Sequence, residues 1–187
     1  MKKLSLLILL SPVFFFLSCD DDDVEIRQAP IVFYDNDGYL LQATCVDDYI
    51  EFFFDITPDT TDARMLTFPN GDFYTLYVDY NNNGTLDRNI DLLFGPLEDG
   101  RICRSELLTE TSTTPCMFSG EITGETLFSA TENSSVPHIN YLLRVPKEVL
   151  SNGSTIGVIV EVYDSASGRR TLPIGADRFG RTLTISW

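Results

Sequence analysis

The chain has 187 residues and a formal net charge of −15 at pH 7, from 28 acidic and 13 basic residues. A chain this acidic repels nucleic acid and anionic lipid headgroups, which excludes a nucleic-acid-binding function. Its length suits one domain with a sizeable buried core. The acidic excess suits a soluble extracellular surface or a protein that binds divalent cations.

Residues 1–23 have the composition of a secretory signal followed by a processing site. Two lysines precede a short apolar run, Leu4–Leu17, and Ser18 precedes Cys19. This order predicts a cleaved signal peptide over residues 1–18. The apolar run is shorter than the ~20 residues of a transmembrane helix. The cysteine after the cleavage point resembles that of bacterial lipoproteins, whose thiol is acylated with fatty acids such as palmitate.

The processing site departs from the lipoprotein pattern, because Phe16 and Leu17 stand where a leucine and a small residue are expected. The alternative is therefore ordinary secretion, with Cys19 as an unmodified thiol. Asp20–Asp23 resembles the acidic tag that directs some Gram-negative lipoproteins to the cell surface. Such a run of like charges is also typical of a solvated spacer. The resemblance implies an outer-membrane protein, anchored by lipid and exposed at the surface, with residues 19–29 as its tether.

Residues 30–187 alternate short strand patterns with turns rich in Gly, Pro, Asn and Asp. This pattern predicts an all-β domain, a single antiparallel β-sandwich with a jelly-roll-like arrangement. A short helical turn is expected at Pro146–Leu150, because proline is tolerated in a first turn. The strand candidates are Leu40–Cys45, Tyr49–Ile56, Tyr74–Val78, Ile90–Phe94, Leu127–Ala130, Ile139–Val145, Thr155–Tyr163 and Arg181–Trp187.

The chain has four cysteines, of which three remain if Cys19 carries lipid. An exported domain meets an oxidising compartment. Cys103 and Cys116 flank a segment rich in Thr and Ser, and a disulfide between them would stabilise the fold by about 3 kcal/mol. Cys45 lies within a strand pattern and is expected to be a buried free thiol. No cluster of cysteine and histidine occurs in the sequence, which argues against a zinc site.

The sharpest local motif is the Asn-rich segment that begins at Asp79. Oxygen-bearing side chains recur there with the ligand spacing of an EF-hand-type calcium loop, and Gly84 stands where such a loop must turn. Ile90 stands where a bidentate glutamate is expected, so Asp91 is predicted to replace that ligand. The predicted ligands are Asp79, Asn81, Asn83, the backbone carbonyl of Thr85, Asp87 and Asp91.

The same segment also has the features of a plain hairpin turn. Asn83-Gly84 is a strong hairpin signal, and two of the predicted ligands are neutral amides, which weakens a cation site. If Ca²⁺ binds, we expect a structural role and a dissociation constant of ~10⁻⁴ to 10⁻³ M. The sequence leaves both interpretations open.

Catalytic motifs are weak in this sequence. His138 is the single histidine, and no serine or cysteine partner is indicated for it. Acidic residues are so abundant that carboxylate pairs arise by chance, and no glycine-rich phosphate loop occurs. Aromatic residues such as Tyr74 and Tyr77 have the chemistry to stack on sugars, but we expect most of them in the core. We therefore predict that the protein is not an enzyme.

Four segments together resemble carbohydrate-binding family 9 and DOMON-like sandwiches, and the resemblance spans residues 31–187. They are Asp47–Asp55 (DDYIEFFFD), Tyr77–Asp79 with the Asn-rich turn after it, Tyr141–Leu150 (YLLRVPKEVL) and Gly157–Asp164 (GVIVEVYD). The resemblance implies the sandwich fold. Members of the family bind sugar ends between paired tryptophans or, in some branches, haem. This chain has one tryptophan, Trp187, so the fold can carry over without that binding function.

These observations favour a cell-surface lipoprotein that acts as a non-catalytic binding module. The expected partners are the membrane, through the lipid anchor, and a glycan or an extracellular protein. One alternative is a structural or adhesive envelope protein without a small ligand, and another is a secreted hydrolase.

Overall fold

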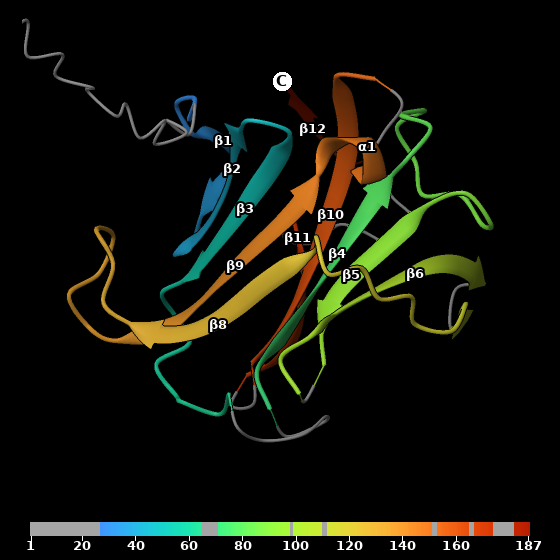
Figure 1. Cartoon of the computed structure of the whole chain (residues 1–187). Helices are drawn as coiled ribbons and strands as arrows, with labels where there is room; N and C mark the ends of the chain where they lie inside the picture. The colour runs from blue at the N-terminus through green and yellow to red at the C-terminus, as the bar shows by residue number, and fades with distance from the viewer. Residues whose placement is uncertain are drawn as a thin grey trace, which may run out of the picture.

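A computed structural model describes residues 27–64, 71–97, 99–109, 112–150, 153–164, 167–173 and 182–187. These residues form two antiparallel sheets that pack against each other (Figure 1), which confirms the predicted β-sandwich. Cys19 and the Asp20–Asp23 segment lie outside the described residues. Arg27 and Gln28, assigned to the tether from the sequence, pair with the end of the second strand through a bridge from Arg27 to Val46 and a hydrogen bond from the Gln28 N–H to the Cys45 carbonyl.

The first sheet has the strand order β1-β2-β3-β9-β8. Its strands are β1 (Ile31–Asn36), β2 (Tyr39–Val46), β3 (Tyr49–Ile56), β8 (Thr123–Ser129) and β9 (His138–Pro146). A two-residue turn at Asp47-Asp48 joins β2 to β3, and it sets the register that pairs Val46 with Tyr49. The one helix within the described residues, the short α1 (Lys147–Leu150), follows directly after Pro146, as the sequence predicts.

The second sheet has the order β11-β10-β4-β5-β6-β7, and β12 also pairs with β10. Its strands are β4 (Phe73–Asp79), β5 (Leu92–Pro96), β6 (Ile102–Thr109), β7 (Ser112–Thr113), β10 (Thr155–Asp164), β11 (Gly168–Leu172) and β12 (Leu183–Ser186). β4 covers one edge of β10. The other edge is shared end to end, with β12 on residues 155–158 and β11 on residues 160–164.

The main core lies between the two sheets, because alternate residues of each strand point inward. Phe54 of β3 meets Tyr74 of β4 edge to face, with 5.2 Å between the ring centroids. Tyr74 in turn lies 4.9 Å from Tyr141 of β9. All three side chains are fully buried. Aromatic contacts of this kind join the first sheet to the second at the centre of the sandwich.

A second apolar cluster lies on the outer face of the second sheet. It consists of Tyr77, Ile159 and Leu107 from three strands, together with Leu86 from the β4–β5 connection, and Leu93 packs against it. Because Leu86 is buried there, the connection from residue 80 to residue 91 is fastened onto the sheet.

Cysteine chemistry in the structure follows the sequence pattern. Cys103 and Cys116 form a disulfide with 5.3 Å between their Cα atoms, and Cys45 is a buried free thiol. No helix in the described part of the chain has the length and apolarity needed to cross a membrane.

Candidate functional site: a polar pocket beside the Asp79–Asp91 loop

The loop from Asp79 to Asp91 connects β4 to β5 at one end of the sandwich. Asp79 is the last residue of β4 and is fully buried, with 0% of its surface exposed. Its two carboxylate oxygens accept the backbone N–H groups of Asn83, at 3.1 Å, and Gly84, at 2.7 Å. Gly84 has a positive φ of 93°, as the sharp bend requires. The Asp79 side chain therefore shapes the first half of the loop.

Gly157 of β10 makes room for the Asp79 carboxylate. The two residues are paired across the strands. A Cβ atom on residue 157 would lie 2.9 Å from Asp79 Oδ2 and 2.3 Å from Thr182 Oγ1. Thr182 is itself tied to the loop, because its N–H donates to the Gly84 carbonyl at 3.3 Å. A glycine is thus needed where the loop, β10 and the segment before β12 converge.

Asp91 holds the second half of the loop. Its carboxylate accepts the N–H of Tyr80, at 2.9 Å, and the N–H of Asp87. Burial raises the pKa of Asp91 to about 6, and the charges of Asp79 and Asp87 act in the same direction, while the two backbone hydrogen bonds act against it. Two buried carboxylates therefore face the inside of the same loop.

The remaining predicted ligands form hydrogen bonds with one another. The side-chain amides of Asn81 and Asn83 both donate to Asp87 Oδ2, the first at 3.0 Å. Asn83 Oδ1 accepts the N–H of Thr85 at 3.0 Å and its hydroxyl at 3.1 Å. The structure thus brings all six predicted residues into one loop, with many of their oxygens engaged by the loop's own donors. Calcium binding stays a prediction.

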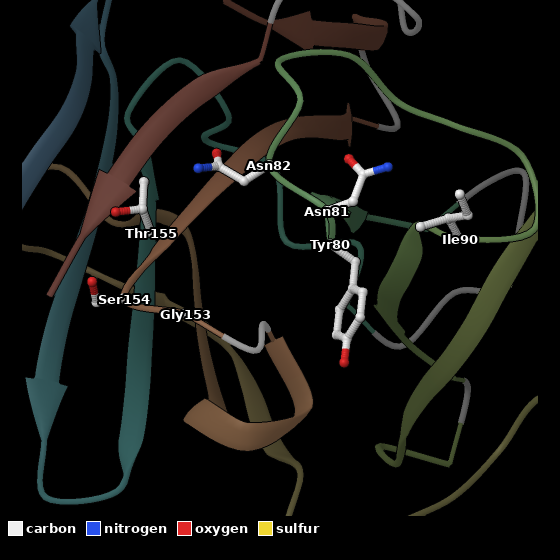
Figure 2. A pocket seen from close by; sticks show the side chains of 7 residues that line it. All are labelled: Tyr80, Asn81, Asn82, Ile90, Gly153, Ser154 and Thr155. Atoms are coloured by element: carbon white, nitrogen blue, oxygen red, sulfur yellow. The ribbon is translucent and has the colours of Figure 1, made fainter.

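A pocket of about 560 Å³ lies next to this loop (Figure 2). It opens where β4 ends and β10 begins, and it is lined by Tyr80, Asn81, Asn82, Ile90, Gly153, Ser154 and Thr155. The β10 side of the pocket is held by β12, since Thr155 pairs with Ser186 and the Trp187 N–H donates to the Ser154 carbonyl at 2.9 Å. Its volume is within the range of small-molecule sites.

The polar groups of the pocket differ in how far the protein already uses them. Asn81 is committed to the loop through both ends of its amide. Within the described residues, the side chains of Asn82 and Ser154 have no hydrogen-bond partner, and Thr155 shares its hydroxyl with Ser186 at 3.1 Å. Figure 2 shows the Asn82 amide directed toward the Thr155 side, with the Tyr80 ring and Ile90 on the other side. The pocket thus combines available donors and acceptors with an aromatic ring.

A second group of acidic side chains, which sequence reasoning missed, is buried at the opposite end of β4. Asp59 follows β3, Asp72 precedes β4 and Asp164 ends β10, and one oxygen from each lies within 4.8 Å of the others. In the described part of the chain no other three Asp, Glu, His or Cys side chains bring their ligand atoms this close together. The carboxylates of Asp79, Asp87 and Asp91 are therefore farther apart than this. Burial, followed by the charges of Asp72 and Asp164, raises the pKa of Asp59 to about 7. Protons or a cation can neutralise such a group.

His138 is a structural residue. It and Asp55 are both 0% exposed, and His138 Nε2 hydrogen-bonds to Asp55 Oδ1. His138 Nδ1 lies 2.7 Å from the Val136 carbonyl. The other oxygen of Asp55 accepts bonds from Thr131, at 2.8 Å, and Asn133, at 2.6 Å. The pair fastens the β8–β9 loop to β3, and its burial leaves no access for a substrate.

No family model matches this chain, and no curated protein matches its sequence. The resemblance to carbohydrate-binding family 9 and DOMON-like domains therefore stays a prediction.

Proposed function

We propose that this protein is a non-catalytic binding module of the cell surface, which binds a glycan in the pocket between residues 80–82 and residues 153–155. The observation that carries the proposal is the lining of this pocket. Asn82, Ser154 and Thr155 offer donors and acceptors beside the ring of Tyr80 and the side chain of Ile90.

Sugar chemistry suits such a lining. Each sugar hydroxyl donates and accepts hydrogen bonds, and the side chains of Asn, Ser and Thr match both roles. The C–H face of a sugar ring is apolar enough to lie against an aromatic ring such as that of Tyr80. The pocket is open to solvent, so an extended glycan has room to continue beyond it.

The N-terminal sequence supports the location. In this proposal Cys19 carries the lipid, residues 19–29 form the tether, and the sandwich faces outward from the outer membrane. Two or more acyl chains give stable anchoring where one chain is marginal. A glycan-binding domain held in this way would contact polysaccharides at the cell surface.

Calcium has a structural role in the proposal. The carboxylates of Asp79, Asp87 and Asp91, the amides of Asn81 and Asn83, and the carbonyl of Thr85 are all oxygen donors of the kind Ca²⁺ prefers. The burial of Asp79 and Asp91 supports this fit, because two nearby buried carboxylates are better tolerated beside a cation. The ion would hold the loop that forms one side of the pocket.

The test is a screen of the purified full chain against an oligosaccharide array, followed by titration of any bound sugar. Trp187 is the only tryptophan, and its N–H donates a hydrogen bond to the carbonyl of Ser154 in the pocket lining. Its fluorescence therefore reports on the pocket. Asn82→Gly removes the amide and keeps a residue that tolerates the positive φ of 53°. We expect this variant and Ser154→Ala to weaken binding about tenfold, the loss of one or two hydrogen bonds.

Asn36→Ala is the matched control, because Asn36 is exposed at the end of β1 in the other sheet. Binding that the pocket variants and this control reduce equally would place the glycan elsewhere. If no oligosaccharide binds, the structural or adhesive alternative gains support. If the chain cleaves glycans, the secreted-hydrolase alternative does.

A further inference from the structure

We propose that this pocket, while the Asp79–Asp91 loop holds no calcium, selects neutral glycans and rejects acidic ones. The inference rests on the proposed function, and it names the chemical class of sugar that the site takes. It follows from the absence of charged side chains in the described lining and from the negative charge of the residues directly behind it.

The pocket lining is uncharged. Its side chains are a tyrosine, two asparagines, an isoleucine, a serine and a threonine, together with one glycine, among the described residues. A carboxylate is usually recognised by an arginine or lysine that pairs with it. Among the described residues no such side chain lines this pocket, so an acidic sugar would lose water without gaining a partner of opposite charge there.

The groups directly behind the lining are negative. The N–H of Tyr80 donates to the carboxylate of Asp91 at 2.9 Å. The amide of Asn81 donates to the carboxylate of Asp87 at 3.0 Å. A uronic acid bound against Tyr80 and Asn81 would therefore lie close to the carboxylates of Asp91 and Asp87, to which these two residues donate hydrogen bonds.

The third aspartate of the loop adds to this field. The N–H of Asn82 donates to the backbone carbonyl of Asp79 at 3.3 Å, and the buried carboxylate of that residue lies at the base of the same loop. Arg88 is the only basic residue in the segment from 79 to 91; it is exposed and is not part of the lining. The loop is therefore negative overall, and like charges brought together at a binding site strongly oppose association.

The test compares sugars that differ only in charge. The probes are oligomers of glucose, galactose and mannose, each paired with the corresponding uronic acid oligomer, in which a carboxylate replaces the C6 hydroxymethyl group. The purified full chain is titrated with each probe in a chelator, so that the loop carries only its own charges, and Trp187 fluorescence and calorimetry give the dissociation constants.

We expect at least one neutral oligomer to bind about tenfold or more tightly than its uronate partner. Raising the salt concentration should narrow the difference, because ions screen the repulsion. Equal or tighter binding of the uronate would overturn the selectivity and leave the proposed glycan binding intact. If neither the neutral nor the acidic oligomers bind, the proposed function fails and this inference fails with it.

A charge variant separates the loop from the net charge of the chain. Asp87→Asn removes one negative charge behind Asn81, and Asp99→Asn removes one from an exposed turn, where Asp99 pairs with Arg101. We expect Asp87→Asn to raise the affinity for the uronate oligomer several-fold, while Asp99→Asn leaves it unchanged. An equal effect of both variants would assign the rejection to overall charge and overturn the role of the loop.

Discussion

The carboxylate of Asp79 occupies the space that a side chain on Gly157 would need, since a Cβ atom there would lie 2.9 Å from Asp79 Oδ2. The two residues face each other across β4 and β10. The start of the Asn-rich loop and the composition of the neighbouring strand are therefore linked, although the two residues are far apart in the sequence.

The first prediction follows from this contact. Gly157→Ala should lower the free energy of unfolding by about 1–3 kcal/mol, because the added methyl group overpacks a site bounded by Asp79 and Thr182. Urea denaturation measures the change. Gly120→Ala is the control, because no atom lies within 4 Å of a Cβ built there. Equal stability of the two variants would contradict the proposed crowding at residue 157.

The second prediction concerns pH and Asp59. Its pKa is raised from 3.8 to about 7 in the folded protein, mainly by burial. The folded state thus keeps the proton to higher pH than the unfolded chain, so this stabilising contribution is complete below pH ~4 and is lost as the pH rises to about 7. Asp59→Asn keeps the site neutral, so this variant should gain stability relative to the parent chain between pH 4 and 7.

Thermal unfolding of both proteins across this pH range measures the gain. Asp62→Asn is the control, because Arg64 lowers the pKa of this less buried carboxyl group. Asp62→Asn should lose stability relative to the parent chain as the pH rises, because a carboxylate with a lowered pKa stabilises the folded state above its ordinary pKa. A constant stability difference between Asp59→Asn and the parent would show that Asp59 titrates normally.

The third prediction concerns the buried pair of Asp55 and His138. His138→Ala should reduce the free energy of unfolding by about 1–3 kcal/mol, because it leaves the fully buried Asp55 carboxyl group without its hydrogen bond to His138. Adding Asp55→Asn should recover part of the loss, because an amide is less costly than a carboxyl group to bury without that hydrogen bond. Denaturation of the two single variants and the double variant gives the coupling energy. Simple addition of the two losses would mean that the pair does not act as a unit.

The fourth prediction concerns calcium and the Asp79–Asp91 loop. Calcium at several millimolar should raise the melting temperature, because binding to the folded state alone contributes about 1–2 kcal/mol at a dissociation constant of ~10⁻⁴ to 10⁻³ M. Asp79→Ala should abolish this rise, whereas Asp99→Ala, in an exposed turn, should keep it. An unchanged melting temperature of the parent chain across calcium and chelator would favour the plain hairpin loop.

The fifth prediction concerns membrane attachment. Acylation of Cys19 should place the protein in the membrane fraction and in the detergent phase on phase separation. Cys19→Ser should release it into the soluble fraction. Cys45→Ser is the control, since that thiol is buried inside the sandwich. Retention of the Cys19→Ser variant on membranes would rule out the lipid anchor.

The sequence predicted the strands whose apolar residues alternate or form a continuous run. Tyr49–Ile56 corresponds to β3 residue for residue, and Thr155–Tyr163 corresponds to all but the last residue of β10. Four of the described strands were not predicted. β6 mixes polar with apolar residues, β11 carries two arginines and β7 has only two residues, whereas β1 was missed although it begins with the apolar run Ile31–Tyr34. Pairing with neighbouring strands overrides the weak preference of such segments.

The candidate sites likewise differ in how far the sequence alone predicts them. The six residues of the Asp79–Asp91 loop are close in sequence, so their spacing predicted that they share one loop. Asp59, Asp72 and Asp164 are brought together only by the packing of β3, β4 and β10. The pocket likewise needs β10 to lie beside β4, which no local pattern encodes. Contacts between distant segments are thus the part that the sequence alone does not reveal.

The burial of Leu86 against Tyr77 and Ile159 has a consequence for affinity. A binding loop that moves freely must lose conformational entropy when it closes on a ligand. Here one leucine side chain fixes the loop during folding, so little motion is left to lose on binding. A glycan would meet a loop that is already in place, and modest hydrogen bonds would then suffice for measurable affinity.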